Sequence, residues 1–235
     1  MQDFEAAFSL AARLILSGDS DLMEIVGLSL SVSLTAVVFA CAIGMVVGAA
    51  LAVTRFPGRP AVIVFLNALM GLPPVVVGLT VYLLLSRAGP LGVLGLLYTP
   101  TAMIVAQTIL VTPIVAALTR QVVEDLHREY EEALKSLGVS GLGLVRTLLW
   151  DGRYSLITVA LAGFGRAVAE VGAVIIVGGN IDHVTRVMTT AIALETSKGN
   201  LAMALALGII LVAVSLAVNG AVAALGGRAG RARHV

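Results

Sequence analysis

The middle of the chain reads Glu129-Tyr-Glu-Glu-Ala-Leu-Lys-Ser-Leu-Gly138, a polar stretch in an otherwise apolar sequence. It lies in a charged island, residues 120–153, which holds 11 of the 29 charged residues of the chain (15 basic and 14 acidic). Glu, Ala, Leu and Lys favour helix, and a glycine such as Gly138 commonly ends one. The stretch therefore predicts a short amphipathic helix at a membrane face, open to water or to a partner.

The composition identifies the surroundings of this island as a lipid bilayer. Of the 235 residues, 59% are hydrophobic and only 12% are charged, and the mean hydropathy is +1.03. A soluble domain carries about 25% charged residues, so the chain is expected to be an all-α polytopic membrane protein. The net charge of +1 argues against a nucleic-acid partner.

Apolar stretches on both sides of the island are long enough to cross a membrane. Residues 1–21 place apolar and charged side chains at helical spacing, which predicts an amphipathic segment at the interface. A transmembrane domain, residues 22–225, follows, and then a basic cytoplasmic tail, residues 226–235. The predicted five spans are about 25–53, 61–86, 101–119, 154–177 and 201–225, with the cytoplasmic loop at 120–153.

Lysine and arginine concentrate in alternate loops, and this distribution predicts the orientation. With the N-terminus outside, loop 54–60, island 120–153 and the tail hold ten basic residues, whereas the outer segments hold four. We therefore expect an N-out, C-in protein of the cell (inner) membrane with the island in the cytoplasm.

The second predicted span contains Gly71-Leu-Pro-Pro-Val-Val-Val-Gly78. Pro73 and Pro74 remove two backbone donors, so the helix should break at mid-depth. Broken backbone in lipid persists only where protein or a water-filled path satisfies it. A bend beside a conduction path and a kinked packing helix both fit this pattern.

The fourth predicted span carries Arg166 and Glu170, which are four residues apart and would share one helix face with Gly163 and Ala173. Charges at this depth are costly unless they pair on an inward face. They are either a structural pair or part of a translocation path.

The sequence lacks the residues of an enzyme. It contains no G-x-x-x-x-G-K-[ST] phosphate loop, no His and Cys cluster with metal-ligand spacing, and no nucleophile with a neighbouring base. Its three histidines, His127, His183 and His234, are predicted to be isolated surface residues. An ion-coupled secondary carrier that uses Arg166 and Glu170 as a relay remains one alternative.

The island resembles a known motif. Glu132-Ala-Leu-Lys-Ser-Leu-Gly138, followed by Leu148-Leu-Trp150, is similar to the EAA loop of ABC importer permeases, which reads Glu-Ala-Ala, three residues, Gly, and later Ile-x-Leu-Pro. Here Leu134 takes the third place and Asp151 stands where the proline is usual. The Glu-to-Gly spacing is kept, and the loop is the penultimate cytoplasmic one, as in that family.

Other segments resemble the oxyanion permeases for sulfate, molybdate and tungstate. These segments are Leu72-Pro-Pro-Val-Val-Val-Gly78, Gly89-Pro-Leu-Gly92, Arg166-Ala-Val-Ala-Glu170-Val-Gly172 and Val177-Gly-Gly-Asn-Ile181. Five spans, a short N-terminus and Glu195-Thr-Ser-Lys-Gly-Asn200 look most like the tungstate branch. A molybdate or sulfate permease is the alternative within this group.

The resemblance implies a type I ABC importer permease fold. It implies a homodimer that works with two ATP-binding subunits and an extracytoplasmic substrate-binding protein. ATP and Mg would sit on the partner ATPase, with no cofactor and no metal in this chain. The residues implied to contact the ATPase are Glu131, Glu132, Ala133, Lys135, Ser136 and Gly138, and those implied for the path or the structural pair are Pro73, Pro74, Arg166 and Glu170.

Overall fold

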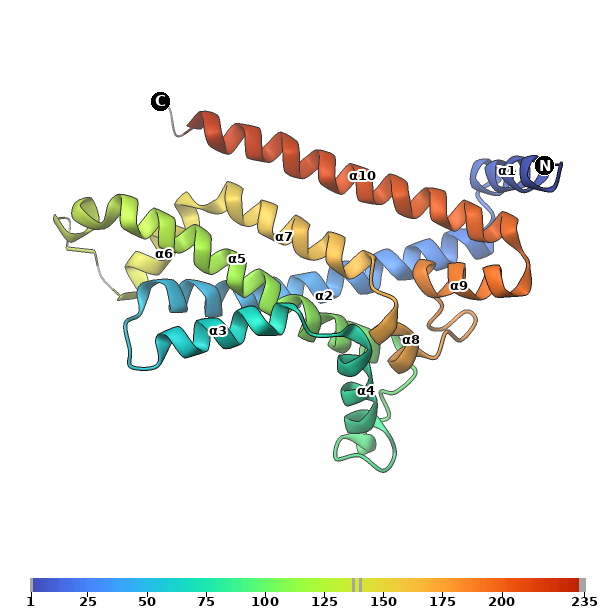
Figure 1. Cartoon of the computed structure of the whole chain (residues 1–235), viewed down its shortest axis with the longest axis horizontal. Coiled ribbons are helices and arrows are strands. Elements are labelled where there is room, and N and C mark those ends of the chain that lie inside the picture. The colour runs from blue at the N-terminus through green and yellow to red at the C-terminus, as the bar shows by residue number, and fades with distance from the viewer. Residues whose placement is uncertain (1, 137, 140, 233–235) are drawn as a thin grey trace. The chain divides into compact units, whose positions relative to one another are not determined.

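A computed structural model of the chain describes residues 2–136, 138–139 and 141–232, and the side chains of 2–4, 135, 142 and 225–232 lie outside the described part. Within these ranges the secondary structure is entirely helical (Figure 1). The elements are α1 Gln2–Ser17, α2 Ser20–Val53, α3 Arg59–Met70, α4 Pro74–Leu85, the 3-10 helix η1 Gly92–Leu94, α5 Pro100–Ser136, α6 Gly141–Asp151, α7 Arg153–Val168, α8 Gly172–Gly178, α9 Met188–Lys198 and α10 Leu201–Ala232.

Among the described residues, three helices are long and apolar enough to cross a membrane, namely α2, α5 and α10. Two further candidates are helix pairs with a sharp bend, α3 with α4 and α7 with α8, and counting each pair as one span gives up to five. The helix α1 forms where the sequence predicts an amphipathic helix. Its position at a membrane interface, like the exact number of spans, stays a prediction.

The break expected in the second span is confirmed. The helix α3 ends at Met70, α4 begins at Pro74, and the two axes differ by 96°. Pro74 occupies the first turn of α4, where the missing N–H would have had no helical partner. The double proline therefore ends one helix and starts the next.

The fourth span is also broken, which the sequence did not predict. The helix α7 ends at Val168, α8 begins at Gly172, and the axes differ by 60°. The expectation that Arg166, Glu170, Gly163 and Ala173 share one helix face is therefore wrong, because Glu170 lies in the break.

The predicted short helix in the island is not a separate element. The helix α5 runs without interruption for 37 residues through Ser136, so the third predicted span and the first half of the island form one rod. Residues 120–136 contain neither glycine nor proline, and strong helix formers continue the apolar helix into the polar segment. Pro113 lies inside α5 without ending it.

The described chain divides into two compact units, and α2, α5, α7 and α10 contribute to both. The first unit contains the residues up to Ala36, Pro73–Gln107 and Arg166–Ala217. In it α4 and α8 lie side by side (Figure 1). A Cβ built on Gly78 would lie 2.7 Å from the Cα of Ala173, so the two helices approach at backbone distance.

The second unit contains Val37–Leu72, Thr108–Gly165 and the residues from Val218 on. Its helices α2 and α5 also touch through glycine, because a Cβ on Gly48 would lie 2.3 Å from the carbonyl oxygen of Ala116. The buried side chains that join α2, α5 and α6 in this unit are Ala49, Ala52, Val123, Leu126, Leu134 and Leu148.

Candidate functional site

The C-terminal end of α5 presents the predicted coupling residues. Glu132, Ala133 and Ser136 are exposed, whereas Leu134 between them is buried in the core of the second unit. The Ser136 hydroxyl donates to the carbonyl oxygen of Ala133 at 2.8 Å, a hydrogen bond within the last turn of α5. Glu131 is half-buried and has an interaction partner, and the side chain of Lys135 lies outside the described residues.

Gly138 makes the turn that ends this face. Its φ is +69°, a left-handed conformation that a side chain disfavours. The N–H of Val139 donates to the carbonyl oxygen of Leu134 at 3.0 Å, the bond that caps a helix through such a glycine. A Cβ on Gly138 would meet no atom within 4 Å. The chain itself therefore needs the backbone of this glycine but leaves the space beside it open.

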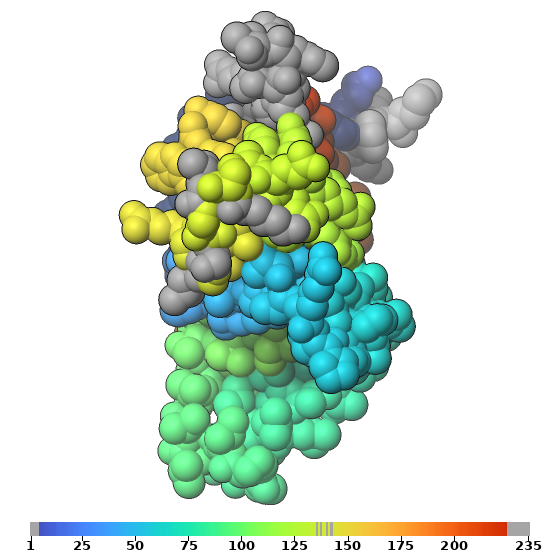
Figure 2. All heavy atoms as spheres, turned by 90° about the vertical axis from the view of Figure 1, so that its left-hand side faces the viewer, coloured from blue at the N-terminus to red at the C-terminus, as the bar shows by residue number. Residues whose placement is uncertain are grey.

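After this turn, α6 packs back against α5. Figure 2 shows this end of α5 in yellow-green next to α6 in yellow. Leu148 is fully buried and belongs to the same core cluster as Leu126 and Leu134. Trp150 near the end of α6 is 69% exposed, and the Arg153 guanidinium lies 5.1 Å from the centroid of its ring. The resulting surface is polar at the end of α5 and aromatic at the end of α6.

The break between α7 and α8 is built around Glu170, which is 3% exposed. Its Oε2 lies 2.6 Å from Nη1 of Arg166, and its Oε1 accepts the N–H of Ala173 at 3.1 Å. Its carbonyl oxygen accepts the Thr189 hydroxyl of α9 at 2.8 Å. One buried residue therefore joins the end of α7, the start of α8 and α9.

The two helix breaks meet. A Cβ on Gly172, the first residue of α8, would lie 2.9 Å from Cγ2 of Val75 in the first turn of α4. Across the second break, the amide of Gln107 on α5 donates to the carbonyl oxygen of Ala167 at 3.1 Å. Pro73 and Pro74 thus lie one turn or less from the contact with the α7–α8 break.

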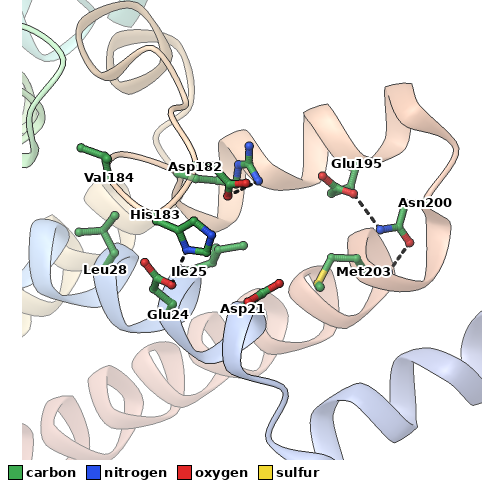
Figure 3. Close-up of a pocket in the computed structure, with 11 residues that line it drawn as sticks. Asp21, Glu24, Ile25, Leu28, Asp182, His183, Val184, Glu195, Asn200 and Met203 are labelled. Carbon is green, nitrogen blue, oxygen red and sulfur yellow. Dashed lines mark hydrogen bonds and ion pairs between the residues drawn. The ribbon is translucent and has the colours of Figure 1, made fainter.

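A polar pocket of about 160 Å³ lies elsewhere in the first unit (Figure 3). His183 is exposed, as the sequence predicts, and its Nδ1 lies 2.8 Å from Oε2 of Glu24, a partner that the sequence did not indicate. Glu195 receives hydrogen bonds from Lys198 and Asn200. The lining residues include Asp21, Glu24, Asp182, His183, Glu195, Asn200 and Met203.

Charge partners shift the pKa values of two groups in this pocket. The hydrogen bond with Glu24, aided by the charges of Glu24 and Asp182, raises the pKa of His183. The hydrogen bond from Lys198 lowers the pKa of Glu195, and the Asn200 amide adds to this effect. His127 is half-buried, and His234 lies outside the described residues.

Residues 21–231 match the family described as binding-protein-dependent transport system inner membrane component. The chain belongs to this family. The permease is accordingly an inner-membrane transport component of a system that works with a substrate-binding protein. This membership excludes the ion-coupled secondary carrier that the sequence left open.

The proteins to which the permease is similar include the following three. A tungstate uptake system permease protein TupB from Peptoclostridium acidaminophilum is 40% identical over 225 residues, which covers 96% of this chain and 99% of that protein. A protein of the same name from Campylobacter jejuni is 45% identical over 64% of this chain and 63% of that protein. A probable anion ABC transporter permease from Haloferax volcanii is 41% identical over 88% and 90%.

Sequence reasoning missed several residues that organise the permease. Thr189 binds the backbone of Glu170 at the second break, and Glu24 pairs with His183 at a separation of 159 residues. Glu124 pairs with Arg59 at a separation of 65 residues. No local spacing pattern connects such pairs, although the charge of Glu24 on the apolar helix α2 could have marked it as a residue in need of a partner.

Proposed function

We propose that this permease is the membrane-spanning subunit of a tungstate importer powered by ATP hydrolysis on a partner chain. Two copies would form the pathway, two ATP-binding subunits would dock on the cytoplasmic side, and a substrate-binding protein would deliver the oxyanion from outside. The observation that supports tungstate as the substrate is the similarity to two tungstate uptake permeases, one of which is matched over 99% of its length.

The end of α5 supports the proposed docking of the ATPase. Glu132, Ala133 and Ser136 are exposed together, and Gly138 leaves open space beside them. Leu134, on the opposite face, anchors the same turn in the core of the second unit. A partner that binds this face would therefore move α5 with it, and nucleotide-dependent closure of two ATPases would switch the permease between two states.

The paired breaks support a path beside α4 and α8, with Arg166 and Glu170 as a structural pair. Glu170 is buried and uses both carboxylate oxygens within the chain, so it is poorly placed to contact an anion in transit. Its negative charge would also repel an oxyanion. The pair would hold the break open at a fixed angle while the neighbouring prolines do the same for α4.

The proposal is tested by reconstituting the permease with its ATPase and binding protein in proteoliposomes. Tungstate uptake should require both partners and ATP, and molybdate and sulfate should compete in the order in which calorimetry finds them to bind the binding protein. Uptake without ATP or without the ATPase would refute the proposal. Uptake of sulfate in preference to tungstate would retain the transport mechanism and replace the substrate.

A further inference from the structure

An ion-pair cluster lies in the second unit. It is separate from the exposed residues Glu132, Ala133 and Ser136 at the end of α5, which we call the coupling face. The carboxylate of Glu124 on α5 binds two guanidinium groups, one on each oxygen. Oε1 lies 2.7 Å from Nη2 of Arg59, the first residue of α3, and Oε2 binds Nη1 of Arg120, one turn earlier on α5. We call these three residues the Glu124 clamp.

The clamp also holds the end of α2. Nε of Arg59 donates to the carbonyl oxygen of Leu51 at 2.8 Å, while its Nη2 binds Glu124. The planar guanidinium therefore donates to two acceptors at once, one on α2 and one on α5. A lysine ammonium cannot make both hydrogen bonds in the same geometry. Arg59 is placed for this by the tight turn at Gly58, whose φ is +89°.

The side chains of the clamp are largely sheltered. Exposed fractions are 23% for Arg59, 18% for Glu124 and 12% for Arg120. Partly buried ion pairs are screened less by salt than surface pairs, and loss of the shared carboxylate would leave two like charges facing each other. One acidic side chain thus adds an ionic link between three helix segments that also pack through Leu51, Leu66, Ala116 and Ala117.

The clamp lies on the same unbroken helix as the exposed residues at the end of α5. Glu124 lies 12 residues before Ser136 on one unbroken helix, a distance of about 18 Å at 1.5 Å per residue. Val123, Leu126 and Leu134 pack along this length against α2 and α6. A displacement of the exposed end of α5 would therefore reach the clamp with little loss to bending.

We propose that Glu124 is a positioning residue that passes movement of the coupling face to α2 and α3, a role that rests on the proposed docking of the ATPase at that face. The clamp makes α2, α3 and α5 move as one body. Without it, the ATPase would still bind and hydrolyse ATP, but only the apolar contacts of α5 would pass its movement to α2 and α3.

The test uses the complex of permease, ATPase and binding protein in proteoliposomes, and the readout is tungstate taken up per ATP hydrolysed. Glu124→Gln should leave ATPase copurification unchanged and lower this ratio by about tenfold. Asp125→Asn, which removes an exposed charge one residue away, should leave the ratio at the wild-type value. Arg59→Lys should give an intermediate loss and decides the matter if Glu124→Gln does not reach the membrane.

An unchanged ratio in Glu124→Gln, or in Arg59→Lys where that variant decides, would overturn the role of the clamp, even if uptake and hydrolysis fell together. Gly138→Glu in the same assay separates this result from failure of the docking proposal. If Gly138→Glu retained copurification and coupled uptake, docking at the end of α5 would itself be wrong.

Discussion

Nη1 of Arg166 lies 2.6 Å from Oε2 of Glu170 although the helix that carries the arginine ends between them. The spacing of four residues thus forms a pair without a continuous helix. The pair fixes the angle at which α8 leaves α7, because the other carboxylate oxygen binds the N–H of Ala173 in α8.

Neutralising this pair should be tolerated better than breaking it. Arg166→Gln alone leaves a buried carboxylate without its cation and should lower the free energy of unfolding by about 1–3 kcal/mol. This is less than for a fully buried pair, because Arg166 is 35% exposed and solvent screens its charge. The double variant with Glu170→Gln should be more stable than Arg166→Gln, as measured by the monodisperse fraction after heating in detergent. Transport by the stable double variant supports a structural pair, and its loss assigns the residues to the path.

Substitutions that add charge or bulk at the coupling face should lower tungstate uptake without unfolding the permease. Gly138→Glu should abolish uptake, at a folding cost of only about 1–2 kcal/mol for the left-handed backbone, and Glu132→Lys should do the same without that cost. Gly18→Glu is the matched control, because Gly18 has a φ of +63° and also lacks neighbours within 4 Å of a Cβ. Normal uptake by Gly138→Glu and Glu132→Lys, at wild-type levels in the membrane, would contradict the proposal that the ATPase binds the coupling face.

The close approach of α2 and α5 should make Gly48 intolerant of any side chain. Gly48→Ala places a methyl group 2.3 Å from a backbone oxygen and should destabilise the second unit by about 1–3 kcal/mol. Gly27→Ala on the same helix meets no atom within 4 Å and should be neutral or slightly stabilising. Equal thermal stability of the two variants would show that α2 and α5 do not touch at this point.

The N-out, C-in orientation predicts which side of the membrane each end of the chain faces. Cys41 is the single native cysteine, so a Cys41→Ser background permits cysteine labelling at chosen sites. Ser136→Cys should react with an impermeant maleimide only in inside-out vesicles, and Ser9→Cys only in intact spheroplasts. Labelling of Ser136→Cys from outside would show the opposite orientation, in which the coupling face does not lie in the cytoplasm.

The His183–Glu24 pair should give a pH-dependent link between α2 and the loop before α9. The raised pKa of His183 means that the charged pair is complete below the ordinary value of 6.5 and is lost as pH rises through the raised folded value. NMR titration of labelled histidine, assigned with His183→Gln, should find a pKa above 6.5. Glu24→Gln should lower it, and an unchanged value in that variant would show that the pair does not form.

Local features of the sequence determined where helices can exist and where one of them must break. Apolar runs without charge predict spans because lipid offers no partner for backbone groups, and Pro73 with Pro74 predicts a break because two donors are missing. The Glu132-to-Gly138 spacing also predicted an exposed helix end, since helix end and exposed face follow from adjacent residues, and the role of that face in coupling stays a prediction.

Only the tertiary structure decided the break at Glu170 and the clamp at Glu124. No proline interrupts residues 153–178, so the break persists because Gln107 and Thr189, from other helices, bind the carbonyl oxygens of Ala167 and Glu170. Arg59 and Glu124 meet because a turn at Gly58 returns the chain to α5. Such contacts depend on how helices pack, and helix packing is set by side-chain shape across the whole unit rather than by any short pattern.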